Sequence, residues 1–573
     1  MQPRHRVRWT VGSAMVMLAA FLAGSCGGDI ESGEDADADD QGQDDVLTDP
    51  PPPDDGGPED LRPDDGGPEE PAQDDIPPDV EETDAPDAPD AEEDAEEPDG
   101  PPPVDCAAIA DSITAAGLLA RLTELATIAS DNGGDRSAGS AGWDASLQYV
   151  EDTLEADGYT VTRGPIEYPY YELLADPLLE RISPTARTYA YAPDDWAPVG
   201  DFQKVAYSPP GNVTAEVTPV DLALGPGNDS TSGCEAADFT GFVAGTIALV
   251  QRGTCYFVEK ALNAQAAGAA GVLLFNQGNS PDREGLMEGG PGMTALDPTN
   301  PDHGVTIPVL FATYAVGEEI ATLIEGGSAV TLHMQVSTVF EVRESQNLIA
   351  ETAGGNADEV VMLGAHFDSV PSAPGINDNA SGAAAVLEIA HVVSTCDVTR
   401  KIRFAFWASE EWGLWGSLTY VVDMPASDLD RIYAYLNADM IGSPNFAVFV
   451  YDGDGSAFGV PGPAGSAEIE RFFVGDLEAH GLSSGPVYFE GSDHFPFEMS
   501  GVAYGGLFTG ASERKTAEEA SAFGGAAGES YDACYHEPCD DLTNVNMDIA
   551  EPLTLSLARA AQFFGVDGLS DPP

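Results

Sequence analysis

Four apolar stretches in the last 214 residues decide the fold. They are VVMLGA at Val360–Ala365, IRFAFWA at Ile402–Ala408, IYAYLN at Ile432–Asn437 and FAVFVY at Phe446–Tyr451. Their near-continuous apolar character is typical of strands that are covered on both faces. Helical patterns over Ala380–Ser394 and Leu414–Val422 separate the first three. We therefore predict an α/β fold with a mostly parallel central sheet flanked by helices.

Polar side chains follow the first of these strands. His366 comes directly after it, and Asp368 lies two residues later, on the same side of an extended chain. A histidine that binds a metal through one ring nitrogen needs its other nitrogen oriented, and a nearby carboxylate can do this. Asp378 lies in the Gly/Asn-rich segment GINDNASG before the next helix, where it could bridge two cations or cap the helix.

Further carboxylates follow the next two strands. Glu410 and Glu411 come after an aromatic strand, and burying such a pair is costly unless cations compensate. Their aromatic neighbours disfavour the alternative, a solvated charge pair. Adjacent side chains point in different directions, so one can bind a metal while the other faces a water molecule. Asp439 ends the third strand, and His536 lies in the loop CYHEPCD at 534–540.

These residues form two metal shells that share one carboxylate. We predict His366, Asp439 and bridging Asp378 around one ion, and Glu411, His536 and the same Asp378 around the other. Nitrogen and carboxylate ligands in this mixture favour zinc, with cobalt or manganese as substitutes. Two Zn²⁺ per chain can activate water for hydrolysis.

A large part of the net charge of −77 lies in one N-terminal segment. Residues 29–105 are rich in Asp, Glu, Pro and Gly and almost free of aromatic residues, with a near-repeat of DDGGPE at 54–59 and 64–69. Such a segment buries too little apolar surface to fold, so we predict a disordered spacer. A loose interaction with calcium is the alternative. The rest of the chain is also acidic, which argues against nucleic acid as a partner.

The N-terminus is typical of an export signal. Three arginines precede an apolar run, Val11–Gly24, which is too short to span a bilayer and ends in LAGSC. This pattern resembles a bacterial lipoprotein signal, in which Cys26 carries the lipid that anchors the chain to a membrane. Ordinary secretion, with cleavage near Ala23 or Ser25, is the alternative. We expect a cell-envelope lipoprotein or an extracellular protein.

Export favours disulfides among the remaining six cysteines. Cys534 and Cys539 flank His536, and Cys234 and Cys255 bracket one hydrophobic strand, so we expect these two pairs. By elimination Cys106 would pair with Cys396.

The middle of the chain has its own strand–helix–strand pattern. A strand in Gly245–Gly253, a helix over Phe257–Ala267 and a strand over Ala270–Asn276 (AGVLLFN) resemble a protease-associated domain. The resemblance implies a non-catalytic accessory domain inserted into the fold.

The flanking sequences resemble the secreted bacterial double-zinc aminopeptidases over residues 106–195 and 340–565. The run GGLFTGASERKTAEEASAFGGAAGESYDACYHEPCD at 505–540 is very similar to the actinobacterial secreted member. The resemblance implies the ligands above, Glu410 as general base and Tyr535 as a hydrogen-bond donor to the tetrahedral intermediate. It also implies peptide or protein N-termini as substrates, with an apolar preference.

One position departs from this pattern. The actinobacterial enzyme has an Arg immediately before the Ser-Asp of its motif, where this chain has Gly491 in Gly491–His494. Alternatives to an aminopeptidase are a dizinc carboxypeptidase or dipeptidase, a glutaminyl cyclase-like enzyme and an inactive binding protein on the same fold. The sequence does not indicate an oligomeric state.

We predict five segments along the chain. They are a signal peptide with its lipobox cysteine (1–26), the spacer (27–105), the first part of a catalytic domain (106–198), the protease-associated domain (199–338) and the second part of the catalytic domain (339–568).

Overall fold

The structure, a computed structural model, describes residues 109–193, 198–287, 289–293 and 300–569. The predicted signal segment with Cys26, the acidic spacer and Cys106 lie outside these residues. Among the helices that are described, none combines the length and the apolar character needed to cross a membrane.

The C-terminal part of the chain forms a mixed sheet in the order β13-β12-β14-β11-β9-β10-β8. Its strands are β8 (Thr331–Glu351), β9 (Asn356–His366), β10 (Arg400–Trp407), β11 (Ile432–Ala438), β12 (Phe449–Tyr451), β13 (Gly485–Val487) and β14 (Tyr504–Phe508). The four central strands β10, β9, β11 and β14 are parallel, whereas β8 and β12 pair antiparallel with their neighbours β10 and β14. The predicted fold class is confirmed.

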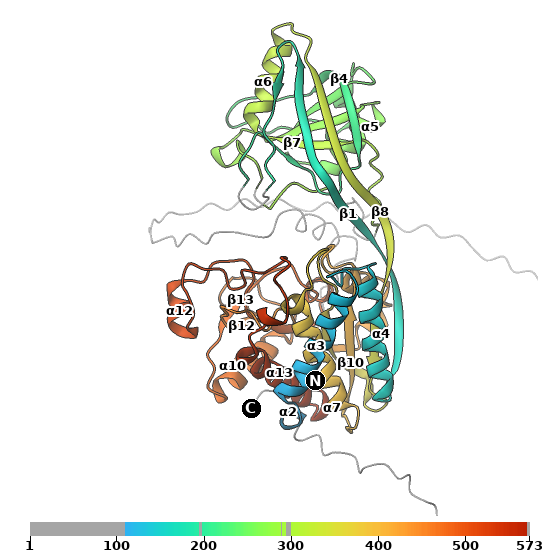
Figure 1. Ribbon diagram of the computed structural model, residues 1–573, viewed down its shortest axis with the longest axis vertical. Helices are drawn as coiled ribbons and strands as arrows, with labels where there is room; N and C mark the ends of the chain where they lie inside the picture. Colours follow the sequence, from blue (N-terminus) through green and yellow to red (C-terminus); the bar gives the residue numbers. More distant parts are fainter. Residues whose placement is uncertain (1–108, 194–197, 288, 294–299, 570–573) are drawn as a thin grey trace, which may run out of the picture. The chain divides into compact units, whose positions relative to one another are not determined.

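Helices cover this sheet and enclose the main core (Figure 1). They are α2 (Ile109–Ser112), α3 (Ala115–Asp131), α4 (Ala141–Ala156), α7 (Ser381–Val393), α8 (Trp415–Asp423), α9 (Ala426–Leu429), α10 (Ser466–Ala479), α11 (Phe495–Met499), α12 (Ala517–Phe523) and α13 (Met547–Ala561). In α3, Leu118, Leu122 and Leu125 recur at helical spacing and are buried. The alanines of α7 leave little side-chain bulk, so this helix is buried almost all round. That position is important because the loop before α7 carries Asp378.

A long antiparallel pair, β1 (Thr160–Ser183) with β8, leads from this sheet to the inserted region (Figure 1). The register runs from Thr160 opposite Glu351 to Ser183 opposite Thr331, with bulges on the way. The sequence around the end of the preceding helix, which stops at Gly158, predicts a strand only over Tyr159–Val161. The rest of β1 was missed because Pro, Glu and Asp interrupt its apolar alternation, and much of it is exposed.

In the inserted region the strand order continues from β8 as β4-β5-β6-β7-β3, with β4 antiparallel to β8. Its elements are β3 (Phe202–Lys204), β4 (Gly211–Val220), β5 (Ile247–Gln251), α5 (Phe257–Ala266), β6 (Gly271–Phe275), β7 (Val309–Ala312) and α6 (Tyr314–Glu325), while the short β2 (Arg187–Thr188) pairs with β1. Strands β4 to β7 are parallel, and β3 is antiparallel to β7. The expected strand, helix and strand are β5, α5 and β6.

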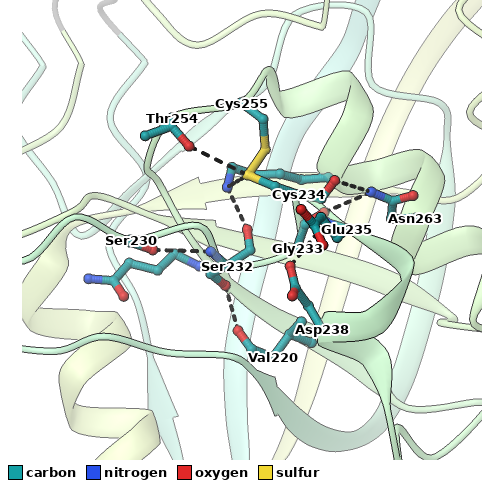
Figure 2. The surroundings of a disulfide bond; sticks show 12 residues. Val220, Ser230, Ser232, Gly233, Cys234, Glu235, Asp238, Thr254, Cys255 and Asn263 are labelled. Carbon is teal, nitrogen blue, oxygen red and sulfur yellow. Dashed lines mark hydrogen bonds between the residues drawn. A yellow bond between two sulfur atoms is a disulfide. The ribbon is translucent and has the colours of Figure 1, made fainter.

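Both predicted disulfides of the described region are present. Cys234 and Cys255 are bonded with a Cα–Cα distance of 5.7 Å, and Asn263 of α5 donates to the carbonyls of Gly233 and Cys234 beside the bond (Figure 2). Cys534 and Cys539 form the second bridge. Cys396 is also disulfide-bonded. Its predicted partner Cys106 lies outside the described residues.

Candidate metal centre

The predicted ligands lie at the carboxyl ends of three parallel strands and in two loops. His366 is the last residue of β9, Glu410 and Glu411 follow β10, and Asp439 follows β11. Because these strands are parallel neighbours, their carboxyl ends meet at one edge of the sheet. The loops after β9 and around His536 complete the site.

The structure brings the predicted ligands into two groups that share Asp378. In the first group, one ligand atom each of His366, Asp378 and Asp439 lies within 4.8 Å of the others. In the second group, Asp378, Glu411 and His536 meet the same limit. Glu410 is in neither group, although it is adjacent to Glu411.

Asp378 faces both groups with different oxygens. Its Oδ1 lies 3.4 Å from Nε2 of His366, and its Oδ2 lies 3.2 Å from Nε2 of His536. The two histidines hold the pKa of Asp378 below its usual range even though burial alone would raise it. A carboxylate that divides its oxygens in this way can bridge two cations. The alternative role as a helix cap is not seen, because α7 has Ala380 at its N-cap.

The loop that carries Asp378 is held in place by hydrogen bonds to the loop that carries His536. Asp540, next to Cys539, accepts the backbone N–H groups of Asn377 and Asp378 at 2.8 and 3.0 Å. Gly375 begins the segment with a φ of 63°, a left-handed conformation that suits glycine. A Cβ at this position would also lie 2.4 Å from the Ser369 side chain. The two loops therefore hold each other in register.

His366 is oriented by its neighbour two residues on. Its Nδ1 lies 3.2 Å from the backbone carbonyl of Asp368, which can only accept a hydrogen bond. Nδ1 therefore carries a proton, and Nε2 faces Asp378 and Asp439. The Asp368 carboxylate in turn accepts the backbone N–H of Glu410 at 3.2 Å. Asp368 thus connects the loops after β9 and β10.

Asp439 is held by a hydroxyl. Ser492 Oγ donates to its Oδ2 at 2.6 Å, while Asn437 donates to Ser492 Oγ at 2.8 Å. The other oxygen, Oδ1, lies 3.5 Å from Nε2 of His366. The hydrogen bond from Ser492 therefore leaves one oxygen of Asp439 directed at the first group.

The glutamate pair is mostly buried, and one oxygen of Glu411 has no donor. Burial raises the pKa of Glu411 to about 7, and burial together with neighbouring carboxylates raises that of Glu410 well above its usual range. Glu411 Oε2 lies 3.0 Å from Nε2 of His536, whereas its Oε1 has no hydrogen-bond partner. Glu410 Oε2 lies 3.8 Å from Nε2 of His366. Of the two glutamates, Glu411 faces the second group.

His536 lies at the rim of the site, with a side chain 38% exposed. The ring of Tyr535 stacks on it with centroids 3.8 Å apart. The Cys534–Cys539 bridge closes this loop, and His536 has a φ of 60° within it. The loop therefore presents His536 and Tyr535 together at the open side of the site.

The donor set fits a pair of zinc ions. Each group offers nitrogen and carboxylate ligands of the kind zinc prefers, and Glu411 Oε1 is a buried acceptor without a donor. Nearby carboxylates hold the pKa values of His366 and His536 well above normal, although burial opposes this. So many carboxylates in a buried site need positive charge, which divalent cations supply.

Sequence reasoning missed several residues that support the site. Arg136 is fully buried in the loop between α3 and α4, and it donates to the carbonyls of Phe367, Pro374 and Gly375. Burial lowers its pKa to about 10. Its neighbours in sequence indicate only a turn. Asp540 and Ser492 lie within motifs that the sequence analysis quotes, but their contacts depend on long-range packing that no local pattern predicts.

Comparison with known proteins identifies the family. The model of peptidase family M28 matches residues 347–559, which include every predicted metal ligand. An aminopeptidase of Pseudomonas aeruginosa strain UCBPP-PA14 is 46% identical over 440 residues, 77% of this chain and 78% of that protein. The chain belongs to peptidase family M28. A leucine aminopeptidase 2 of Trichophyton rubrum is 41% identical over 343 residues, covering 60% of this M28 peptidase and 65% of the fungal protein.

The inserted region and the fold also have counterparts. The model of the PA domain, the protease-associated domain, matches residues 213–320 of this M28 peptidase. An aminopeptidase from Aneurinibacillus sp. strain AM-1 superimposes with a TM-score of 0.58 at 23% identity, covering 82% of this chain and 98% of that chain. At this identity the superposition supports the fold alone. The predicted family, with its PA domain, is confirmed.

Proposed function

We propose that this M28 enzyme, a zinc-dependent aminopeptidase, is exported and releases N-terminal, mainly apolar, amino acids from peptides, with Glu410 as the general base. The observation that carries the proposal is the division of Asp378 between two ligand groups, with Oδ1 facing His366 and Oδ2 facing His536. A purely structural metal site needs no carboxylate that bridges two ions. It also needs no second carboxylate, such as Glu410, that lies beside the ions without binding them.

His366, Asp378 and Asp439 would hold one zinc ion, and Asp378, Glu411 and His536 the other. Bound zinc would supply Lewis acidity, which polarises the substrate carbonyl and acidifies water. The protein contributes the fixed ligand positions that Asp540, Asp368 and Ser492 maintain.

Glu410 is the residue with the properties of a proton carrier. It lies beside both groups, mostly buried, but belongs to neither, and desolvation raises its pKa above the usual range of a carboxyl group. A base with a pKa closer to the working pH transfers protons more effectively. Glu410 would take a proton from the attacking water and later deliver it to the amine that leaves.

Tyr535 would stabilise the oxyanion that forms at the substrate carbonyl. It adjoins the ligand His536 and stacks on its ring, which places it at the rim of the centre. A phenol that donates a hydrogen bond only when charge develops lowers the barrier selectively.

The free amine of the substrate would be held by the excess of carboxylates beside the first group. An arginine that the actinobacterial relative has in this region is replaced by Gly491, around which a Cβ would find open space. Substrate contacts through that arginine are therefore not expected. The apolar preference rests on the names of relatives such as leucine aminopeptidase 2.

Export is supported by the N-terminal LAGSC pattern and by the disulfides Cys234–Cys255 and Cys534–Cys539, which suit an oxidising compartment. Lipid on Cys26 would attach the enzyme to a membrane. Replacing Cys26 by Ser should release the protein from the membrane fraction and remove the mass of the lipid. If the Cys26→Ser variant stayed in the membrane fraction to the same extent as the wild type, a lipid anchor on Cys26 would be contradicted.

A panel of aminoacyl arylamides tests the activity. We expect turnover by the zinc-loaded protein, loss of turnover on chelation, and no turnover of the N-acetylated versions, because acetylation removes the positive charge that the carboxylates hold. Cleavage of N-acetylated peptides from their C-terminus would instead show a carboxypeptidase. Faster turnover of leucyl than of glutamyl or lysyl substrates would support the apolar preference.

A further inference from the structure

The disulfide Cys234–Cys255 of the inserted region has a charged neighbour. Nζ of Lys260, on α5, lies 3.5 Å from Sγ of Cys234. The lysine is fully buried, whereas both cysteines are partly exposed, so a reagent from solvent can approach the disulfide. We propose that this disulfide is a thiol-exchange site, which external dithiols reduce and which releases Cys234 as a thiolate paired with Lys260.

Lys260 has no counterion among the residues that the structure describes. Its Nζ donates to the carbonyl of Ser232, which is neutral. Asp238 and Glu259 act on it only through their charge, without a hydrogen bond. Burial lowers the pKa of Lys260 to about 8, so the ammonium is still the main form at neutral pH. A buried ammonium without an anion is costly, and a thiolate on Cys234 would supply the anion.

The ammonium is held in place independently of the disulfide. Ser232 Oγ donates to the carbonyl of Val220 on β4 and accepts the backbone N–H of Gln251 on β5 at 3.0 Å (Figure 2). The residue whose carbonyl receives Lys260 is thereby fixed between two strands. Since Lys260 itself extends from α5, its Nζ should stay beside Cys234 when the bond opens.

The segment around Cys234 also has attachments that survive reduction. Asn263 of α5 donates to the carbonyls of Gly233 and Cys234, both at 3.0 Å (Figure 2). The two cysteines are 21 residues apart in the sequence, and these hydrogen bonds hold the first of them against α5 without the bridge. Opening the disulfide therefore requires no unfolding of this segment, and the exchange can be reversible.

The exchange transfers two electrons in two steps. A thiolate of the dithiol attacks Cys255 Sγ, the sulfur–sulfur bond breaks, and its electron pair passes to Cys234 Sγ. The second thiol of the reductant loses its proton, attacks the reductant's own sulfur in the mixed disulfide and releases Cys255. The dithiol becomes a cyclic disulfide. Of its two protons, one goes to Cys255 and the other to solvent, because Cys234 stays a thiolate.

Lys260 favours this direction of attack and stabilises the product. A leaving thiol of lower pKa departs faster, and a disulfide whose reduced form is stabilised is easier to reduce. The positive charge beside Cys234 has both effects. The hydroxyl of Thr254, with Oγ1 3.9 Å from the same sulfur, adds a polar neighbour (Figure 2). Cys234 is therefore the better leaving group of the two cysteines.

Equilibrium reduction of the full-length, zinc-loaded protein tests the proposal. The protein is held at neutral pH in buffers of reduced and oxidised dithiothreitol and quenched by alkylation, and peptide mass spectrometry gives the state of each cysteine. In Lys260→Met and Lys260→Gln, half-reduction of Cys234–Cys255 should require a ratio of reduced to oxidised dithiothreitol at least about tenfold higher than in the wild type, equivalent to about 30 mV. The bridge Cys534–Cys539 is the internal control and should respond equally in all three proteins.

The pH dependence of alkylation separates the charge of Lys260 from a merely structural role. In the reduced wild type, Cys234 should react with iodoacetamide with a pKa of about 7.5 or lower, against about 8.5 for an ordinary thiol. Both variants should return this pKa to the ordinary value or above. The wild-type measurement decides the matter if a variant does not fold.

Two results would overturn the proposal. One is an ordinary or raised pKa of Cys234 in the wild type. The other is the same dithiothreitol midpoint in the wild type and in either variant. Lys260→Gln can still donate to the carbonyl of Ser232, so wild-type behaviour of this variant would show that the hydrogen bond matters and the charge does not.

Discussion

The catalytic sheet and the PA-domain sheet are both built from parallel strands, and they differ at the carboxyl ends of those strands. After β9, β10 and β11 come His366, the pair Glu410–Glu411, and Asp439. In the PA domain, β5 ends in Gln251, β6 is followed by Asn276, and β7 ends in Ala312.

The polar groups of the two regions are also satisfied differently. Gln251 is fully buried, accepts the N–H of Ala223 at 2.9 Å and donates to the carbonyls of Ala223 and Gln277. Asn276 donates to the carbonyl of Gly285 and accepts from Arg252. By contrast, Glu411 keeps a buried oxygen without any donor.

The completeness of the hydrogen bonds therefore distinguishes a polar cluster that only stabilises the fold from one that binds a metal ion. Neutral amides whose hydrogen bonds are complete need nothing further and can lock loops together. Buried carboxylates with open oxygens are unstable unless a cation joins them. The same strand-end geometry therefore serves folding in one domain and metal binding in the other.

The largest expected effect comes from neutralising the proposed general base, Glu410. Glu410→Gln keeps the shape of the side chain but cannot accept a proton, so kcat/KM for leucyl arylamide should fall by about 10²–10⁴-fold. Zinc content should match the wild type, because Glu410 belongs to neither ligand group. Turnover close to the wild-type level would show that Glu410 is not the base.

Removal of the metal should have the next largest effect, and it should act on stability as well as activity. Chelation leaves the carboxylates of both groups without cations, and a ligand present at about a thousandfold excess over Kd stabilises a protein by about 4 kcal/mol. We expect the thermal midpoint to fall on chelation and to recover with zinc, measured by calorimetry.

Asp378→Asn is the matched variant for this prediction, since it removes the shared ligand. It should bind less zinc than Glu410→Gln and show a smaller change of midpoint on chelation. A midpoint that responds to the chelator as in the wild type would contradict the shared role of Asp378.

Gln251→Glu makes a PA-domain strand end resemble the catalytic one. The new carboxylate oxygen would face the carbonyls of Ala223 and Gln277, to which the amide now donates. We expect a loss of about 3–5 kcal/mol in the free energy of unfolding, typical of a buried charge without a partner. Urea unfolding measures this, and zinc content should not rise. A gain of bound zinc would show that a buried carboxylate alone is enough to create a metal site, which would contradict the need for a complete ligand group.

The smallest effect concerns a buried lysine of the PA domain. Lys260 of α5 donates to the carbonyl of Ser232 and lies 3.5 Å from Cys234 Sγ, and burial lowers its pKa from 10.5 to about 8. Between these two values the unfolded chain binds more protons than the folded one, so the free energy of unfolding should rise with pH across this window.

Lys260→Met tests this pH dependence by urea unfolding at several pH values. The difference in stability between wild type and variant should shift in favour of the wild type as pH increases from 8 to 10.5. Tyrosines titrate in both proteins, so the comparison isolates Lys260. A difference that stays constant with pH would contradict the lowered pKa.

Much of the catalytic region was predictable because its signals are local. The strands around Leu363, Phe404 and Leu436 are apolar on both faces, and each leads directly into a charged motif. The candidate ligands follow from the same local signals. Order along the chain and the geometry of parallel sheets place such motifs at one edge.

The remaining features depend on contacts between distant parts of the chain. Strand β1 was predicted at only its first residues, because its partner β8 lies over 150 residues away and its apolar alternation is broken. No apolar pattern around Arg136 predicts its burial, yet the segment before Asp378 closes around it through the carbonyls of Pro374 and Gly375. The domain boundaries and the pairing of Cys106 stay predictions.

The central claim is that two metal ions share Asp378, and anomalous scattering at the zinc edge tests it most directly. A crystal of the zinc-loaded protein should show two anomalous peaks, one among His366, Asp378 and Asp439 and the other among Asp378, Glu411 and His536. A single peak, or a peak that Asp378 does not contact, would contradict the account.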